Sequence, residues 1–285
     1  MSLDAVALQV MLGALRAACD EMGVVLIRSA HSANIKERGD ASTALFDADG
    51  QLVMQAEHIP VHLGAMPSAV AAVLGEQHAP GDAWILNDPF AGGTHLPDIT
   101  LVSPVFTAAR ERLGFAASRA HHADVGASEP GSMPAGSRTL ADEGVVIPPT
   151  RLIRAGSLDR ELLADLTGQM RNPRQREADL RAQLAANRTG GERLAALSDR
   201  MGVDTLRTGM AETLDYAERR TRARLAEIPD GGRTAADVLE APEGDLELRL
   251  RARVSGDELE LDFSDSAPMH DGNLNSPLAV RLAAC

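Results

Sequence analysis

The chain has 285 residues, of which 44% are hydrophobic, and its formal net charge is −13. This length can bury a sizeable core, and the strong negative charge argues against binding to the phosphates of a nucleic acid. Aromatic residues make up only 2%, so the core must consist of aliphatic side chains. No run of about 18 apolar residues is present, so neither a membrane span nor a membrane partner is expected.

The two cysteines do not suggest a disulfide framework. Cys19 falls within a helical pattern and Cys285 is the last residue. Two separate thiols are typical of a reducing compartment. The N-terminus contains Asp4 and lacks the basic region that precedes the apolar stretch of a signal peptide. We therefore predict a cytoplasmic protein.

The first half of the chain predicts alternating helices and strands. Leu8, Met11 and Leu15 recur at helical spacing and predict an N-terminal helix. An Asp-Ala-Asp-Gly turn at residues 47–50 predicts a hairpin. Short apolar runs with β-branched or aromatic residues predict three further strands. The expected elements are a helix over 3–24, a hairpin over 42–55, a helix over 66–76, and strands over 83–86, 99–106 and 114–118.

The composition changes after Pro148-Pro149, which interrupts the chain. Two segments, residues 158–188 and 192–225, are rich in Ala, Leu, Arg and Glu, and each predicts a long helix. The sequence Arg-Thr-Gly-Gly-Glu at 188–192 is predicted to separate them.

The end of the chain returns to a strand pattern. Residues 246–254 and 259–263 alternate between apolar and polar types around Ser-Gly-Asp, which predicts a hairpin with one solvated face. The fold class is therefore α+β. We expect a β-rich portion that carries the motifs over 1–150, and a helical portion with a terminal hairpin over 151–285.

Histidine and aspartate gather in two segments punctuated by glycine and proline, residues 87–98 and 119–126. Pro97 disfavours a helical conformation at the residue before it, so the first segment is a turn that enters a strand. The second segment follows a strand directly, and two adjacent strands ending at one rim would bring the polar groups together. Imidazole and carboxylate are ligands of zinc, manganese and iron(II). The candidate metal ligands are His95, Asp98 and His121, with Asp40 as a fourth, and His122 and Asp124 lie beside them. A set of hydrogen-bonded turn residues is the alternative.

Other polar residues are candidates for contacts to a substrate or to the ligands. His58 and His62 flank Pro60, which excludes a helical metal site, so they are candidate donors to ligands or substrate. Turn hydrogen bonds are the alternative. Ser132 lies in a turn with no base adjacent in sequence, which favours a substrate contact over a nucleophile. No phosphate-cradling or dinucleotide-binding glycine motif is present, so ATP is not expected to bind here.

Six longer motifs follow one another along the chain and can be compared with those of known families. They are Glu37–Ser42, His58–Met66, Asn87–Asp98, Ser118–Gly126, Pro130–Pro134 and Asp179–Asn187. Their types and order resemble those of the hydantoinase B/oxoprolinase family. That family includes the B subunit of ATP-dependent N-methylhydantoinases, the C-terminal half of 5-oxoprolinase and the related subunit of acetone and acetophenone carboxylases. The resemblance extends to Asn275-Ser-Pro277 and so covers nearly all of the chain.

The resemblance implies a division of labour between two subunits. An A-type partner with the actin-like ATPase fold uses ATP to phosphorylate a small cyclic amide or ketone, and the B-type subunit completes the reaction. In the amidohydrolase branch this second step is metal-assisted hydrolysis of the ring C–N bond. The implied roles are metal ligation by Asp40, His95, Asp98 and His121, general base catalysis or ligand support by Asp124, and orientation by His122.

The resemblance also sets expectations about length and branch. The family continues for a second half of comparable size, so the chain is expected to represent the N-terminal half of the family length. The apolar segment 276–285 is expected to pack against that second half. The motifs around His58 and Ser132 favour a hydantoinase- or 5-oxoprolinase-like hydrolase. A carboxylase subunit and a non-catalytic fragment that binds the A-type partner are the alternatives.

Overall fold

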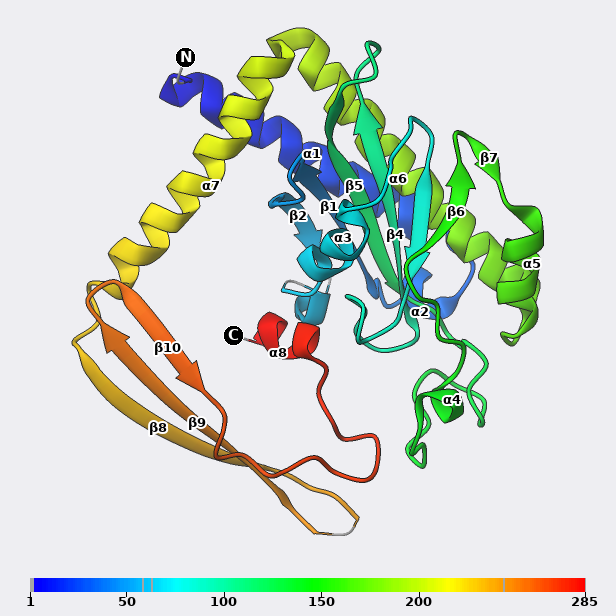
Figure 1. Cartoon of the computed structure of the whole chain (residues 1–285), viewed down its shortest axis with the longest axis vertical. Coiled ribbons are helices and arrows are strands. Elements are labelled where there is room, and N and C mark those ends of the chain that lie inside the picture. The colour runs from blue at the N-terminus through cyan, green and yellow to red at the C-terminus, as the bar shows by residue number, and fades with distance from the viewer. Residues whose placement is uncertain (1–2, 58, 63, 243, 285) are drawn as a thin grey trace.

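The computed structural model describes residues 3–284 except 58, 63 and 243, and it confirms the expected α+β fold (Figure 1). The body is a seven-stranded sheet in the order β2-β1-β5-β4-β3-β6-β7, in which every neighbouring pair is antiparallel. The strands are β1 Ala41–Asp47, β2 Leu52–Glu57, β3 Ala83–Leu86, β4 Asp98–Phe106, β5 Arg112–His121, β6 Thr150–Arg154 and β7 Ser157–Leu158.

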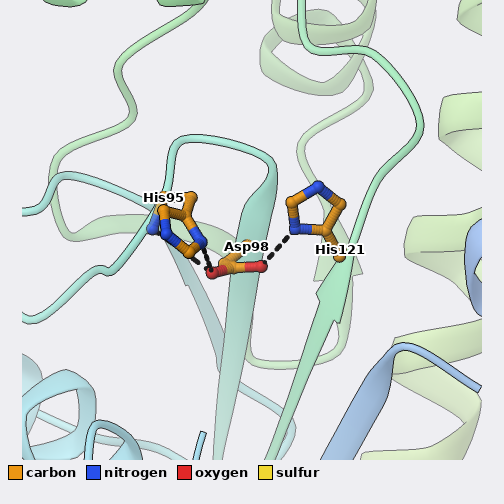
Figure 2. A group of neighbouring side chains, drawn as sticks. All are labelled: His95, Asp98 and His121. Atoms are coloured by element: carbon orange, nitrogen blue, oxygen red, sulfur yellow. Dashed lines mark hydrogen bonds and ion pairs between the residues drawn. The ribbon is translucent and has the colours of Figure 1, made fainter. Parts of the chain in front are cut away.

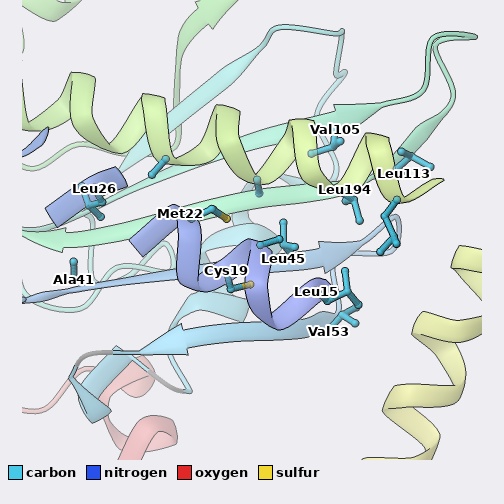
Figure 3. Close-up of a cluster of buried hydrophobic side chains, with 14 of the residues drawn as sticks. Leu15, Cys19, Met22, Leu26, Ala41, Leu45, Val53, Val105, Leu113 and Leu194 are labelled. Atoms are coloured by element: carbon cyan, nitrogen blue, oxygen red, sulfur yellow. The ribbon is translucent and has the colours of Figure 1, made fainter. Parts of the chain in front are cut away.

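Helices cover both faces of this sheet. α1 (Ala5–Ser29) and α6 (Pro173–Met201) pack on the face that contains Leu45. α3 (Met66–Leu74) packs on the opposite face, against Phe46. Successive strand residues point to opposite faces, so neighbouring positions contribute to different cores. Figure 3 shows the first core, in which aliphatic and sulfur-containing side chains of α1 meet those of β1, β2 and α6.

Five shorter helical elements complete the body and its connections. They are α2 Ala33–Lys36, the 3-10 helix η1 Pro60–His62, α4 Leu140–Glu143, α5 Arg160–Gly168 and α8 Leu278–Ala284. None of the described helices is both long and apolar enough to cross a membrane.

Segments beyond residue 150 belong to the same core as the first portion. β6 and β7 extend the sheet beside β3, which the sequence analysis did not predict. Leu152, Leu163 and Leu180 pack with Ile85 and Leu101 of the first portion. The two portions therefore share a core. Their division at residue 150 stays a prediction.

The predicted break at residues 188–192 is wrong, because α6 continues through Gly190 and Gly191 to Met201. A Cβ at Gly190 would lie 2.3 Å from Sδ of Met22 on α1. The glycine therefore permits close contact between two helices and does not end one. The helix ends instead at Gly202, which has a φ of 85° that favours glycine.

The helix predicted over residues 158–188 is also divided. α5 ends at Gly168, and α6 begins at Pro173 after a turn. Asn172, the residue directly before α6, adopts a left-handed φ of 55°. Proline is favoured in the first turn of a helix because its missing N–H has no partner there in any case, so this start has a local cause.

After α6, the chain leaves the body through α7 (Val203–Leu225) and a three-stranded sheet, and α8 then returns to pack against η1 (Figure 1). α7 leads to this second sheet, whose three strands lie in the order β10-β9-β8. The predicted terminal hairpin is confirmed as β9 (Leu246–Ser255) and β10 (Glu258–Asp262). The third strand, β8 (Gly231–Leu239), was not predicted, because its glycine- and alanine-rich sequence has a weak strand pattern.

Candidate metal centre

Three neighbouring strands end at one rim of the large sheet. Asp98 is the first residue of β4, and its register partner His121 is the last residue of β5. Asp40 directly precedes β1, and its carbonyl accepts the backbone N–H of His121 at 3.0 Å. The sequence analysis predicted that strand ends would gather these residues, and the structure brings them to one place.

The carboxylate of Asp98 lies between two imidazoles (Figure 2). Its Oδ1 is 2.7 Å from Nδ1 of His121, and its Oδ2 is 3.0 Å from Nδ1 of His95. One candidate ligand atom from each of the three residues can be chosen so that all lie within 4.8 Å of one another. Asp98 and His121 are buried, whereas the side chain of His95 is 35% exposed. The cluster is therefore accessible from the side of His95.

A third imidazole reaches the same carboxylate from a distant segment. Nε2 of His62, at the end of η1, lies 3.7 Å from Oδ1 of Asp98 and has no hydrogen-bond partner although it is buried. Nδ1 of His62 is 3.0 Å from the hydroxyl of Ser42 on β1. His62 thus lies beside the candidate ligand Asp98, and its supporting role stays a prediction. His58, its predicted companion, lies outside the described residues.

The imidazoles keep Asp98 ionised. Burial alone would raise the pKa of Asp98, but the hydrogen bonds from His121 and His95, together with the nearby imidazole of His62, hold this pKa well below its usual range. The same pairing with Asp98 raises the pKa of His95 against the opposing effect of burial. A buried carboxylate that stays negative beside nitrogen donors is a suitable environment for a cation.

Asp40, the predicted fourth ligand, is buried at the same rim. Burial raises the pKa of Asp40, and the nearby His121 opposes this effect. Its carboxylate is not a member of the three-residue cluster, although it interacts electrostatically with both Asp98 and His121. Asp40 thus borders the cluster.

Two residues that the sequence analysis missed hold the turn above the cluster. The hydroxyl of Thr94 donates to Oδ2 of Asp98 at 2.6 Å. The buried guanidinium of Arg119 donates from Nη2 to the carbonyl of Gly92 at 2.9 Å and from Nε to Thr100 at 2.7 Å. Burial lowers the pKa of Arg119 to about 10, so it remains charged at neutral pH. A charged residue two positions before His121, within a mainly apolar strand, was the signal available in the sequence.

The glycine pair in this turn is required by close packing. Gly92 has a φ of 93°, and a Cβ there would lie 2.5 Å from the carbonyl oxygen of Ser68 on α3. A Cβ on Gly93 would lie 2.1 Å from the carbonyl oxygen of Asn87. Any larger residue would displace the turn that carries His95, so the glycines help to position a candidate ligand.

His122 faces the opposite side of the sheet from His121. Its Nε2 donates to Oε1 of Gln183 on α6 at 3.0 Å, and burial lowers the pKa of His122 to about 4. Its backbone N–H donates to the carbonyl of Pro97 at 2.8 Å. His122 therefore connects the turn and the strand end to α6, which is compatible with the predicted orienting role.

Asp124 anchors a loop through both carboxylate oxygens. Oδ1 accepts from the backbone N–H of Gly126 at 2.8 Å, and Oδ2 accepts from that of Gly131 at 3.0 Å. Nη1 of Arg171 lies 3.1 Å from each oxygen. These contacts occupy the carboxylate and do not favour its predicted use as a general base. Ser132 follows Gly131 in this loop and is half-buried.

The donor set fits a divalent cation. Two imidazoles and one carboxylate are a common protein contribution to catalytic metal sites, in which a further position remains for substrate or water. The unpartnered buried Nε2 of His62 adds a nitrogen aimed at the same carboxylate. His95, Asp98 and His121 are thus the residues that could hold a metal ion.

Comparison with known proteins shows the family to which the chain belongs. The pattern of the family described as Hydantoinase B/oxoprolinase matches residues 4–285. A 5-oxoprolinase from Saccharomyces cerevisiae is 35% identical over 280 residues, which cover 93% of this chain and 22% of the yeast protein. Caprolactamase subunit beta from Pseudomonas jessenii is 33% identical over 263 residues, which cover 90% of this chain and 45% of that subunit.

A solved structure shares the same architecture. The crystal structure of the ATP-dependent caprolactamase from Pseudomonas jessenii superposes with a TM-score of 0.93 at 31% sequence identity. The superposition covers 99% of this chain and 50% of the other. The chain therefore spans half or less of the length of these similar proteins.

Proposed function

The chain belongs to the hydantoinase B/oxoprolinase family, and from this premise we propose that it is the metal-bearing part of a B-type subunit of an ATP-dependent cyclic amidohydrolase. The observation that carries the proposal is the cluster of His95, Asp98 and His121 at one rim of the sheet. The printed names of the similar proteins, 5-oxoprolinase and caprolactamase, favour a small cyclic amide as substrate. Hydrolysis of its C–N bond is the proposed reaction.

His95, Asp98 and His121 are the proposed metal ligands, and Asp40 is the candidate to complete the set. A divalent zinc, manganese or iron ion held there would supply Lewis acidity for attack of water on the amide carbon. Two of these residues determine the charge and the accessibility of the site. Asp98 supplies a fixed negative charge, and the partly exposed His95 lies on the side from which a substrate can approach.

The surrounding residues hold the cluster in position. Thr94 and His62 lie against the Asp98 carboxylate, and Arg119 ties the glycine turn to the sheet. Preorganised groups of this kind avoid reorganisation during the reaction. His122 orients the strand end through Gln183. We assign Asp124 to anchoring the loop that carries Ser132, and Ser132 is the candidate substrate contact.

The proposed partner is an A-type subunit with the actin-like ATPase fold. It would bind ATP and activate the amide by phosphorylation, after which this chain would complete the hydrolysis. The description of the similar caprolactamase as ATP-dependent and the name subunit beta support this division. The sequence itself contains no phosphate-cradling glycine motif.

Metal analysis tests the site independently of the partner. We expect about one divalent ion per purified chain by inductively coupled plasma mass spectrometry, and loss of it in the His95→Ala and Asp98→Ala variants. His31→Ala, which changes an exposed histidine, is the matched control and should retain the metal. Full occupancy in both ligand variants would show that the site is misplaced.

Activity tests the reaction once the metal is established. The chain would be mixed with an A-type ATPase from the same organism, and ring opening of 5-oxoproline, hydantoin and caprolactam would be followed with ATP present or absent. We expect ATP-dependent ring opening of one of them. Ketone carboxylation that depends on bicarbonate, with no ring opening, would instead support the carboxylase branch.

A further inference from the structure

The three-stranded sheet has one apolar face and one charged face. Even-numbered residues of β9 are apolar, and the register places Leu259 opposite Val254 and Leu239 opposite Leu246. Residues directly opposite in an antiparallel pair share a face. The leucines of this face are Leu239, Leu246, Leu248, Leu250, Leu259 and Leu261. β8 also contributes two charged residues to it, because Asp237 lies opposite Leu248 and Arg233 lies opposite Ala252. The face is therefore mainly, not wholly, apolar.

The charged face is suited to water. Arg249 pairs with Glu247 at 2.8 Å, and Arg251 lies 3.6 Å from Asp262 of β10. Arg253 lies opposite Glu260 in the register. Arg249 and Arg251 are exposed and paired with carboxylates, so this face is suited to contact with water.

Part of the apolar face is not covered by any residue that the structure describes. Leu248 is 47% exposed and Leu259 is 45% exposed. α7 contacts the sheet at β10, and Arg222 lies 3.6 Å from Asp257 in the turn between β9 and β10. Figure 1 shows the sheet held away from the body beyond α7. Contiguous exposed apolar side chains of this kind are typical of a surface that another polypeptide covers.

The similar proteins indicate what covers it. The caprolactamase structure superposes on 99% of this chain, which includes this sheet, yet only 50% of the caprolactamase chain is matched. In that structure the chain that contains the corresponding sheet therefore has about as many further residues again, outside the matched region. α8 lies against η1 of the body and is separate from this sheet, and it also has exposed apolar side chains, Leu278 and Leu282.

We propose that the apolar face docks the polypeptide that forms the remaining half of family-length proteins. The occupant presents an apolar surface, since charged or polar groups facing these leucines would lose water without gaining partners. The inference does not depend on the metal centre or on the reaction.

Co-expression provides the test. The tagged 285-residue chain would be produced together with the part of Pseudomonas jessenii caprolactamase subunit beta that lies outside the matched region, both as separate chains and as one fused chain. We expect a 1:1 complex by light scattering, and slower amide hydrogen exchange in β9 and β10 than in the chain alone.

Matched variants locate the contact. Leu248→Glu should weaken the complex at least about tenfold, because a charge would face an apolar partner. Arg249→Glu, on the opposite face, should leave affinity unchanged. Equal effects of the two variants, or no complex and no added exchange protection in either format, would overturn the proposal. A homodimer of the lone chain that Leu248→Glu dissociates would overturn it too, by naming a second copy as the occupant.

Discussion

The body and the three-stranded sheet differ in which side chains they bury. In the body, Asp98 and Arg119 are charged and almost fully buried. In the three-stranded sheet, Leu248 and Leu259 are apolar and nearly half exposed. Residue type alone therefore does not decide burial in this chain.

Partners available in the surrounding structure explain the difference. The buried charges of the body have specific hydrogen-bonding neighbours, and its strands have helices on both faces. The three-stranded sheet has partners for several of its charges, but Leu239, Leu248 and Leu259 remain exposed among the residues that the structure describes. The body therefore carries its own core, whereas the three-stranded sheet leaves part of its apolar face exposed.

The largest expected effect comes from removing the central carboxylate. Asp98→Ala would leave His62, His95 and Thr94 without their shared acceptor in a buried place. We expect the free energy of unfolding to fall by about 3–5 kcal/mol. Urea denaturation of the metal-free proteins would measure it. A change below about 1 kcal/mol would mean that the network does little for the body.

The same substitution in the two regions gives the most direct contrast. Leu45→Ala in the fully buried core should lower the free energy of unfolding by about 2–5 kcal/mol. Leu248→Ala in the exposed sheet should change it by no more than about 0.5 kcal/mol. Both would be measured by urea denaturation of the lone chain. Comparable losses would show that the sheet is packed in solution.

A smaller effect is expected where α6 crosses α1. Gly190→Val should force Met22 to move within a packed core and destabilise the protein by about 1–3 kcal/mol. Gly13→Ala is the control, because this exposed helical glycine has open space around it. The control should raise stability by about 0.5–1 kcal/mol. Thermal unfolding of both variants would reveal opposite shifts.

The smallest effect is a pH dependence at the rim. Hydrogen bonding to Asp98 raises the pKa of His95 above its unfolded value of about 6.5. Its contribution to stability is therefore fully present below pH 6.5 and lost as pH rises through the folded pKa. In the metal-free chain, His95→Asn should flatten the fall in stability above pH 6.5. Identical pH profiles for both proteins would contradict this assignment.

Local patterns in the sequence predicted many elements correctly. The turn at 47–50, the apolar runs of β3, β4 and β5, and the alternation in β9 each depend on neighbours along the chain. The same patterns placed Asp98 and His121 at strand ends, and antiparallel pairing of those strands then made them neighbours. The fold class and the heart of the candidate site could therefore be predicted.

Contacts between distant segments were decided only by the tertiary structure. Nothing near Gly190 in the sequence records that Met22 packs against it, so the glycine pair was taken for a helix end. His62 approaches Asp98 only after η1 is folded onto the rim, and His122 is directed to α6 by the alternation of β5. Periodicity and turn chemistry act over a few residues, whereas burial and close approach depend on which surfaces meet.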